Sequence, residues 1–164
     1  MIILGIDPGL ATVGFGVIRS EKNVNIPLDF GVILTPKDAP FPKRLQMIET
    51  GVKRLIEKYN PNEIALEELF FNNNQKTAID VAQARGVIVN VCYRHTEKLF
   101  EYTPLQIKQA LTGYGRAEKK QIQQMVATFL NLKKIPRPDD AADALAVCLT
   151  HANTARFSSG FGIK

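Results

Sequence analysis

The stretch GIDPGLATVGFGV, residues 5–17, places a single carboxylate, Asp7, at the end of an apolar run and follows it with a Pro-Gly turn. The chain begins MIILGID, a continuous apolar segment of the kind formed by a strand that is covered on both faces. VGFGVIRS, residues 13–20, predicts a second strand. Asp7 either caps the turn or faces a charged group that must approach the strand end closely, and Gly9, without a side chain, would leave room for that group.

The next segments extend this beginning into a sheet. A third strand is predicted at 27–35, and its short polar connection to the second strand makes the first three an antiparallel meander. An apolar stripe in residues 42–59 predicts a helix that Asn60 and the following proline end. EIALEELF, residues 63–70, predicts a fourth strand, which the strand–helix–strand order places parallel to the first.

The rest of the chain is mainly helical. We predict a helix at 74–94, a strand at 97–103, and helices at roughly 104–112, 117–131 and 139–152. The order indicates an α/β fold with a five-stranded mixed sheet, three strands antiparallel and two parallel, flanked by helices on both faces. Ligands of such sheets usually bind where the carboxyl ends of adjacent parallel strands meet. If the first and fourth strands are neighbours, Asp7 and Glu67 meet at that edge.

Composition restricts the class of protein. The chain has 164 residues, of which 45% are hydrophobic and 23% charged, as in a soluble globular protein. We expect one domain over residues 1–152 and a flexible tail over 153–164. The N-terminal segment has neither a basic region nor a long apolar run, which predicts a cytoplasmic protein that does not bind membranes. Cys92 and Cys148 lie in apolar stretches and are expected to be buried thiols.

The positive charge of the chain is local. The net charge is +5, and residues 104–137 hold seven Lys or Arg side chains but one acid, Glu118. Such a segment forms either a solvated helical face or a surface for an acidic partner such as nucleic acid.

The segment PRPDDAADALAVCLTH, residues 136–151, predicts a helix with several acids in its first turns. Asp140 and Asp143 are three residues apart and therefore lie on one face, whereas Asp139 directly follows a proline and is expected to cap the helix. The two acids on one face either complement the helix dipole or share a divalent cation. With the two strand-end carboxylates nearby, a site for Mg²⁺ or Mn²⁺ is the favoured interpretation.

The chain closely resembles the RuvC-type Holliday-junction resolvases of bacteria in five segments: ILGIDPGLATVGFGVI, ALEELFF, AQARGV, GRAEKKQIQ and DDAADALAVCLTH. The resemblance runs from Met1 to about His151, with the motifs in the family's order and spacing. It implies an RNase H-like endonuclease of the retroviral-integrase superfamily. Such an enzyme acts in recombination and repair as a homodimer that nicks two opposed strands of a four-way DNA junction, leaving 5′-phosphate and 3′-hydroxyl ends.

The resemblance also implies roles for individual residues. The four carboxylates of the family match Asp7, Glu67, Asp140 and Asp143, which would hold two Mg²⁺ ions, with Mn²⁺ as a substitute. Lys119 matches a basic residue with a part in the reaction and in DNA contact, and Lys108 and Phe70 match further DNA contacts. Two neighbouring cations, Arg116 and Lys120, are expected to contact phosphates without regard to sequence.

The helix at 74–94 carries Ala78, Ala82 and Gly86 at four-residue steps, a strip on which another helix could pack closely. Core packing explains this strip equally well, and the resemblance favours a homodimer interface. A branch-migration helicase is the further partner that the family implies.

Three other classes compete with this interpretation. An acid before a glycine turn also occurs in actin- and hexokinase-like ATPases, but those folds usually need two such domains and leave the helical acids unexplained. A non-catalytic junction-binding protein would not need all four acids. An RNase H-like nuclease with another nucleic-acid substrate would, and cleavage of a synthetic junction separates it from a resolvase.

Overall fold

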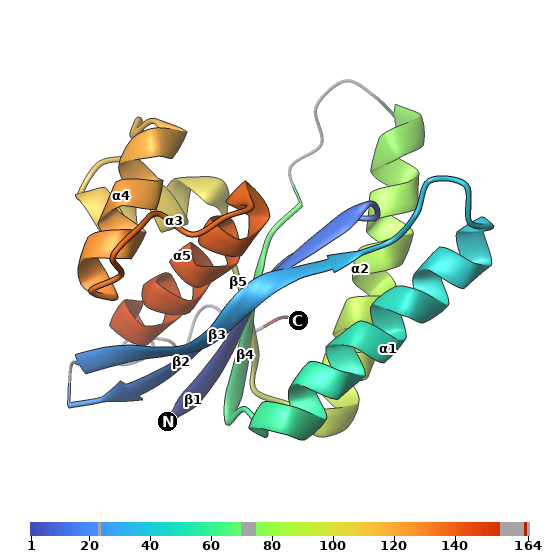
Figure 1. Ribbon diagram of the computed structural model, residues 1–164, viewed down its shortest axis with the longest axis horizontal. Helices are drawn as coiled ribbons and strands as arrows, with labels where there is room; N and C mark the ends of the chain where they lie inside the picture. The colour runs from blue at the N-terminus through green and yellow to red at the C-terminus, as the bar shows by residue number, and fades with distance from the viewer. Residues whose placement is uncertain (23, 70–74, 155–162, 164) are drawn as a thin grey trace.

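The computed structural model describes residues 1–22, 24–69, 75–154 and 163, and of residues 75–77 the backbone alone. A five-stranded mixed sheet divides the molecule into two layers of helices (Figure 1). The strands are β1 (Ile2–Asp7), β2 (Thr12–Glu21), β3 (Val24–Leu34), β4 (Glu63–Glu67) and β5 (Leu99–Tyr102). They lie in the order β3-β2-β1-β4-β5, and the first three are antiparallel while β4 is parallel to both β1 and β5. The predicted sheet is confirmed.

Five helices cover the two faces of this sheet, as the sequence predicted. They are α1 (Phe41–Tyr59), α2 (Gln75–His95), α3 (Pro104–Thr112), α4 (Lys119–Phe129) and α5 (Asp139–Thr154). Figure 1 shows α1 and α2 on one side of the sheet and the other three helices on the opposite side. The helix ends follow local signals: Asn60 adopts a left-handed conformation after α1, and capping boxes at Thr103 and Glu118 begin α3 and α4.

Each face of the sheet has its own hydrophobic core, because strand side chains alternate between the faces. In β1, Leu4 and Ile6 pack with α1 and α2, whereas Ile3 packs with the helices of the opposite layer. β1 is buried on both sides, as its unbroken apolar sequence predicted. Both cysteines are also buried and free, as expected.

Helix α5 lies unusually close to β1 and β2 because glycines form the surface beneath it. A Cβ atom on Gly5 would lie 2.5 Å from Sγ of Cys148 and would overlap the carbonyl oxygen of Ala144. A Cβ on Gly16, the residue paired with Gly5 across the strands, would lie 2.8 Å from the side chain of Leu145. Any larger residue at these positions would push the helix off the sheet.

Several predicted boundaries differ from the structure. The fourth strand ends at Glu67 instead of residue 70, because β1, the strand beside it, ends at Asp7. The fifth strand is shorter than predicted and pairs with β4 alone over Leu99–Tyr102. Most of the expected polar turn after β2 belongs instead to β2 and β3, which extend to Glu21 and from Val24.

The C-terminal segment differs in part from the predicted tail. α5 continues through Thr154, whose hydroxyl donates a hydrogen bond of 3.0 Å to the hydroxyl of Tyr102. Residues 155–162 and 164 lie outside the described residues. The backbone N–H of Ile163 donates a hydrogen bond of 3.1 Å to the carbonyl of Leu99 on β5. Within the described part of the chain, no helix is long and apolar enough to cross a membrane.

We predict that Gly5→Ala lowers the free energy of unfolding by about 1–3 kcal/mol, the usual effect of overpacking a dense core. The backbone carbonyl of Ala144 cannot move away without displacing α5. Gly31→Ala is the matched control, because the added Cβ there meets only ring carbons of Phe15, at 3.1 Å. Chemical denaturation measures both variants, and equal losses would contradict the role given to close helix packing.

Candidate active site

Two carboxylates end neighbouring parallel strands on the same face of the sheet. Asp7 is the last residue of β1 and Glu67 the last residue of β4, and the two strands pair in parallel up to the residue before each. Since side chains alternate along a strand, Asp7 shares a face with Gly5, and Glu67 shares a face with Ala65, which packs in the core beneath α5. Both carboxylates are therefore presented to α5, and the meeting predicted from the sequence is confirmed.

Helix α5 brings two further acids to this edge. A Cβ on Gly14 would overlap the carbonyl oxygen of Asp140, and Gly14 is the residue of β2 that pairs with Asp7. The first turn of α5 thus lies directly on the sheet beside Asp7. Asp143 follows three residues later, and the charges of Asp140, Asp143 and Glu67 all act on Asp7. The structure brings together the quartet that the sequence predicted.

Burial and mutual repulsion make this cluster hard to ionise. Burial first, and then the charges of Glu67, Asp143 and Asp140, raise the pKa of Asp7 to about 8. Burial and the charge of Asp143 raise the pKa of Glu67 to about 7. Burial also raises the pKa of Asp143, against the opposing effect of a hydrogen bond from Lys119. A bound cation would relieve this repulsion, and perturbed acids of this kind mark functional sites.

Lys119 supplies a cation to the cluster. It is the first residue of α4, and its Nζ donates a hydrogen bond of 2.8 Å to Oδ2 of Asp143 and lies 3.8 Å from Oδ2 of Asp139. Burial lowers the pKa of Lys119, but the hydrogen bond and the charge of Asp143 outweigh it and leave the pKa raised. Lys119 therefore remains an ammonium ion beside the acids at neutral pH.

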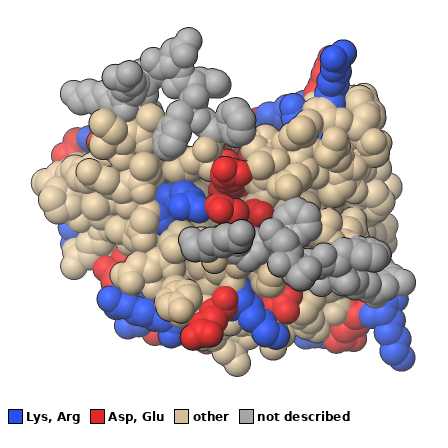
Figure 2. Space-filling view, turned by 180° about the vertical axis from the view of Figure 1, so that it is seen from behind, with Lys and Arg blue, Asp and Glu red and all other residues tan. Residues whose placement is uncertain are grey.

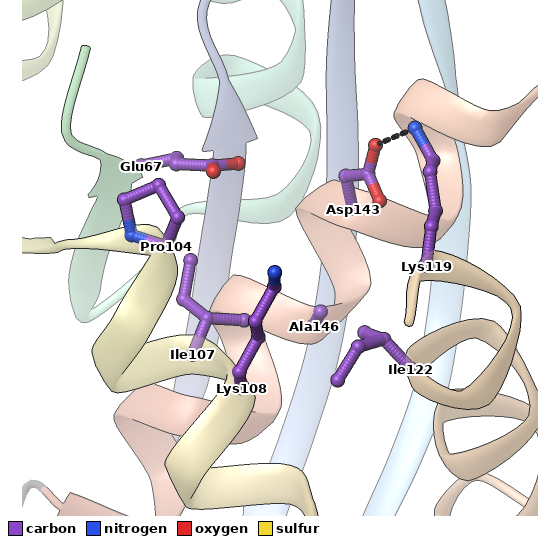
Figure 3. Close-up of a pocket in the computed structure, with 8 residues that line it drawn as sticks. All are labelled: Glu67, Pro104, Ile107, Lys108, Lys119, Ile122, Asp143 and Ala146. Atoms are coloured by element: carbon purple, nitrogen blue, oxygen red, sulfur yellow. Dashed lines mark hydrogen bonds and ion pairs between the residues drawn. The ribbon is translucent and has the colours of Figure 1, made fainter. Parts of the chain in front are cut away.

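A cavity of about 250 Å³ lies between the acids and the lysines (Figure 3). Glu67 and Asp143 line it, and Lys108 on α3 and Lys119 on α4 project from the facing helices. Its remaining walls are apolar and consist of Pro104, Ile107, Ile122 and Ala146. The space-filling view shows acids gathered near the centre of one face with basic side chains directly beside them (Figure 2). An anionic group that enters this cavity would therefore lie beside Lys108 and Lys119 as it approaches the acids.

The oxygen donors of this site fit a hard divalent cation. Carboxylates are the ligands that Mg²⁺ and Mn²⁺ prefer. Among the residues that the structure describes, no three metal-binding side chains converge on one point as a preformed ligand set. Asp143 is paired with Lys119 instead, and the side chains of these two residues are 23% and 57% exposed. A cation could therefore enter the site after small movements of partly exposed side chains.

Two interpretations made from the sequence are wrong. Asp139 is the first residue of α5 and not its cap, because the carbonyl of Pro138 already accepts a hydrogen bond of 3.0 Å from the N–H of Ala141. The carboxylate of Asp139 accepts a hydrogen bond from Arg137 instead. Gly9 does not leave room for a ligand, since a Cβ there would overlap the carbonyl oxygen of Thr12. The glycine is required by the turn itself.

The other candidate residues have different surroundings. Arg116 and Lys120 are exposed close to Lys119 in sequence, whereas Phe70 lies outside the described residues. On α2, Ala82 and Gly86 are exposed, and Ala78 is half-buried. The glycines under α5 were not predicted as part of the site. Their signal was present in the sequence, because Gly14 and Gly16 repeat at the two-residue period of one strand face.

Comparison with known proteins assigns the chain to a family. The sequence model of the family "Crossover junction endodeoxyribonuclease RuvC" matches residues 3–151. The chain belongs to the RuvC family. It is 56% identical over 164 residues to the RuvC of Alkaliphilus oremlandii, with both chains covered completely. It is 51% identical over 154 residues to the RuvC of Clostridioides difficile, covering 94% of this chain and 91% of the relative.

Solved structures place the RuvC-family chain in the same fold. Thermus thermophilus RuvC superposes with a TM-score of 0.91 at 34% identity, over 99% of this chain and all of the other. The same protein in complex with a Holliday junction substrate superposes with a TM-score of 0.90 at 32% identity, over 99% and 100% of the two chains. The yeast mitochondrial Holliday junction resolvase Ydc2 shares the fold at 15% identity, with a TM-score of 0.65 over 92% of this chain and 78% of the other.

We predict that the stability of this RuvC-family protein, measured with a chelator present, falls as the pH rises from about 4 to about 8. The pKa values of Asp7 and Glu67 are raised to about 8 and about 7, so the folded state holds protons that the unfolded chain has already released in this range. Their contribution is fully present below the unfolded pKa values and is lost as the pH rises through the folded ones. Thermal unfolding at half-unit pH steps measures the slope, which Asp7→Asn should reduce. An unchanged slope in that variant would contradict the assignment.

Proposed function

We propose that this RuvC-family endonuclease resolves four-way DNA junctions with paired, symmetric nicks made by metal-dependent hydrolysis at the carboxylate cluster. The observation that carries the proposal is the convergence of Asp7, Glu67, Asp140 and Asp143 at one sheet edge, with Lys119 beside them. The raised pKa values of Asp7 and Glu67 are the expected property of acids placed to bind cations. Hydrolysis at this site would leave 5′-phosphate and 3′-hydroxyl ends.

The carboxylates would hold two Mg²⁺ ions, with Mn²⁺ as a substitute. Asp7 lies at the centre of the cluster and interacts with the other three acids, so it is the residue best placed to contact both ions. Glu67 would complete the ligands of one ion, and Asp140 and Asp143 those of the other. Ions held in this way activate a water molecule and stabilise the charge on the leaving oxygen.

The two lysines at the cavity would act on the phosphate. Lys119 is hydrogen-bonded to Asp143, so its ammonium group already lies at the edge of the acid cluster, where a scissile phosphate must enter. Its charge can stabilise the additional negative charge of the transition state. Lys108 faces the same cavity from α3 and would bind the phosphate as a point charge.

The neighbouring basic surface would bind the arms of the junction. Arg116 and Lys120 are exposed, and no ion pair joins either of them to a carboxylate within the described part of the chain. Contacts of this kind bind DNA without regard to sequence and weaken steeply with salt. Phe70, which lies outside the described residues, would contact an unpaired base by stacking.

A second copy of the chain would dock on α2. Ile79 and Tyr93 are 59% and 58% exposed, and Ala82 and Gly86 are exposed between them at helical spacing. This row of exposed apolar and small residues is suited to another helix. A two-fold dimer would hold two active sites at a fixed separation, as paired nicks require. We expect the dimer to act in the bacterial cytoplasm, together with a branch-migration helicase.

A nuclease with another nucleic-acid substrate would have the same carboxylates. The relatives at about 50% identity over nearly the whole chain are all named for crossover junctions, which favours the junction. A non-catalytic binding protein would not retain buried acids whose ionisation is opposed by their neighbours.

We expect Asp7→Asn to abolish Mg²⁺-dependent cleavage of a synthetic four-way junction and to leave junction binding unchanged or stronger, because the amide cannot hold the cation and cannot ionise to repel phosphate. Asp139→Asn is the matched control, since Asp139 contacts Arg137 and Lys119 outside the quartet. It should retain most of the activity. Strand-by-strand mapping and gel-shift titration measure the two effects, and loss of cleavage in the control alone would contradict the assignment.

We expect Gly86→Arg to convert the dimer to a monomer without unfolding the chain. A Cβ at Gly86 meets no atom within 4 Å, and arginine is a better helix former than glycine by about 1 kcal/mol. Sedimentation equilibrium measures the association, and cleavage mapping should show single nicks in place of paired ones. Glu49→Arg on the exposed surface of α1 controls for the added charge. A dimer that survives Gly86→Arg would exclude this part of α2 as its interface.

A further inference from the structure

The two edges of the sheet are protected to different extents. β5, at one edge, is short, and Ile163 covers part of it by donating a hydrogen bond to the carbonyl of Leu99. β3, at the other edge, pairs with β2 alone. Exposed strand edges attract further strands, and proteins usually blunt them with proline, charge or bulges.

Such devices occur in β3, but only in its first half. Pro27 interrupts the strand, and the register with β2 shifts directly after it. Asp29 is the last charged residue of β3, and its carboxylate is bound by Tyr59 and Lys58. The following residues, FGVIL at 30–34, keep a regular register and contain neither proline nor charge.

The backbone groups that face outward in this second half can be assigned. The N–H of Phe30 donates to Oδ1 of its neighbour Asp29 and therefore does not point toward β2. Because the direction alternates along an antiparallel strand, the N–H and C=O groups of Val32 and Leu34 also point outward. No strand among the described residues pairs with them.

A groove of about 500 Å³ runs beside this edge, between β3 and α1. Its apolar surface comes from Ile33, Leu34 and Met47, and the side chain of Leu34 is 62% exposed. Lys43 and Arg54 stand on the α1 wall. No acid lines the groove, and within the described part of the chain neither cation is in an ion pair.

We propose that this edge and groove bind an extended acidic segment of another protein, which adds a strand to β3. Its backbone would bond to Val32 and Leu34, its apolar side chains would enter the groove, and its carboxylates would meet Lys43 and Arg54. The unpaired backbone groups and the exposed Leu34 favour a polypeptide over DNA, because a phosphate backbone cannot continue a strand ladder. The surface is separate from the acid cluster and goes beyond the proposed junction chemistry.

The probe for this test is a fluorescein-labelled 12-residue peptide with the repeat Val-Thr-Glu-Thr, which as a strand presents valine and glutamate in turn on one face. It is titrated against the full-length protein by fluorescence anisotropy. We expect saturable binding, and slower amide hydrogen exchange at Val32 and Leu34 when the peptide is bound. The peptide with lysine in place of glutamate should bind far more weakly. No binding of the glutamate peptide at millimolar concentration, or unchanged exchange, would overturn the proposal.

Two variants separate a strand site from a general charge effect. Arg54→Glu should weaken peptide binding about fivefold, and the matched variant Lys53→Glu, one residue away and outside the groove, should change it little. Val32→Pro removes an outward N–H without touching the β2 ladder and should abolish binding.

The variants Arg54→Glu and Val32→Pro should both cleave a four-way junction normally. Weaker junction binding by Arg54→Glu than by Lys53→Glu would identify the groove as a DNA contact. A weaker self-association would identify a second copy as its occupant. Either result would overturn the proposal.

Discussion

The contact between α5 and the glycines of β1 and β2 is the constraint on which the carboxylate cluster depends. Gly5, Gly14 and Gly16 leave no side chain between the helix and the sheet, and the carbonyl oxygen of Asp140 occupies the space that a Cβ on Gly14 would fill. Without this approach the acids of α5 would stand at least a side-chain width farther from Asp7. The same glycines therefore determine core packing and the spacing of the clustered carboxylates.

Bringing acids together in this way opposes stability. Burial and like charges raise the pKa of Asp7 to about 8 and that of Glu67 to about 7, so the folded chain resists the ionised state of these acids. Lys119 relieves part of the repulsion through Asp143. Such a cluster trades stability for function if, as we propose, a cation and a substrate phosphate enter it. The lysine would be ready to transfer its contact from carboxylate to phosphate.

The antiparallel meander, the parallel fourth strand and the four carboxylates could be predicted from the sequence because they depend on local patterns. Short apolar runs between turns predict the strands, and an acid at the end of such a run places Asp7 and Glu67 at the sheet edge. Asp139 was misplaced because the start of α5 depends on one backbone hydrogen bond, from Ala141 to Pro138, which no side-chain pattern encodes. The need for glycine at position 9 could not be predicted either, because a Cβ there would overlap the backbone carbonyl oxygen of Thr12. The pairing of Lys119 with Asp143 joins residues of separate helices and required the tertiary structure.

The far end of α5 is also held in place, by contacts of a buried histidine. His151 is fully buried in the last turns of the helix, with Nε2 2.8 Å from Glu63 and Nδ1 2.8 Å from the hydroxyl of Tyr102. Burial lowers the pKa of His151, against the opposing effect of Glu63. Glu63 begins β4, and Glu67 ends it. The helix and the strand that carry the clustered acids are thus joined by a partly buried hydrogen bond at one end and meet at the acid cluster at the other. Neither element can slide along the other without breaking that bond, so the distance between Glu67 and Asp143 is set by the fold before any cation binds.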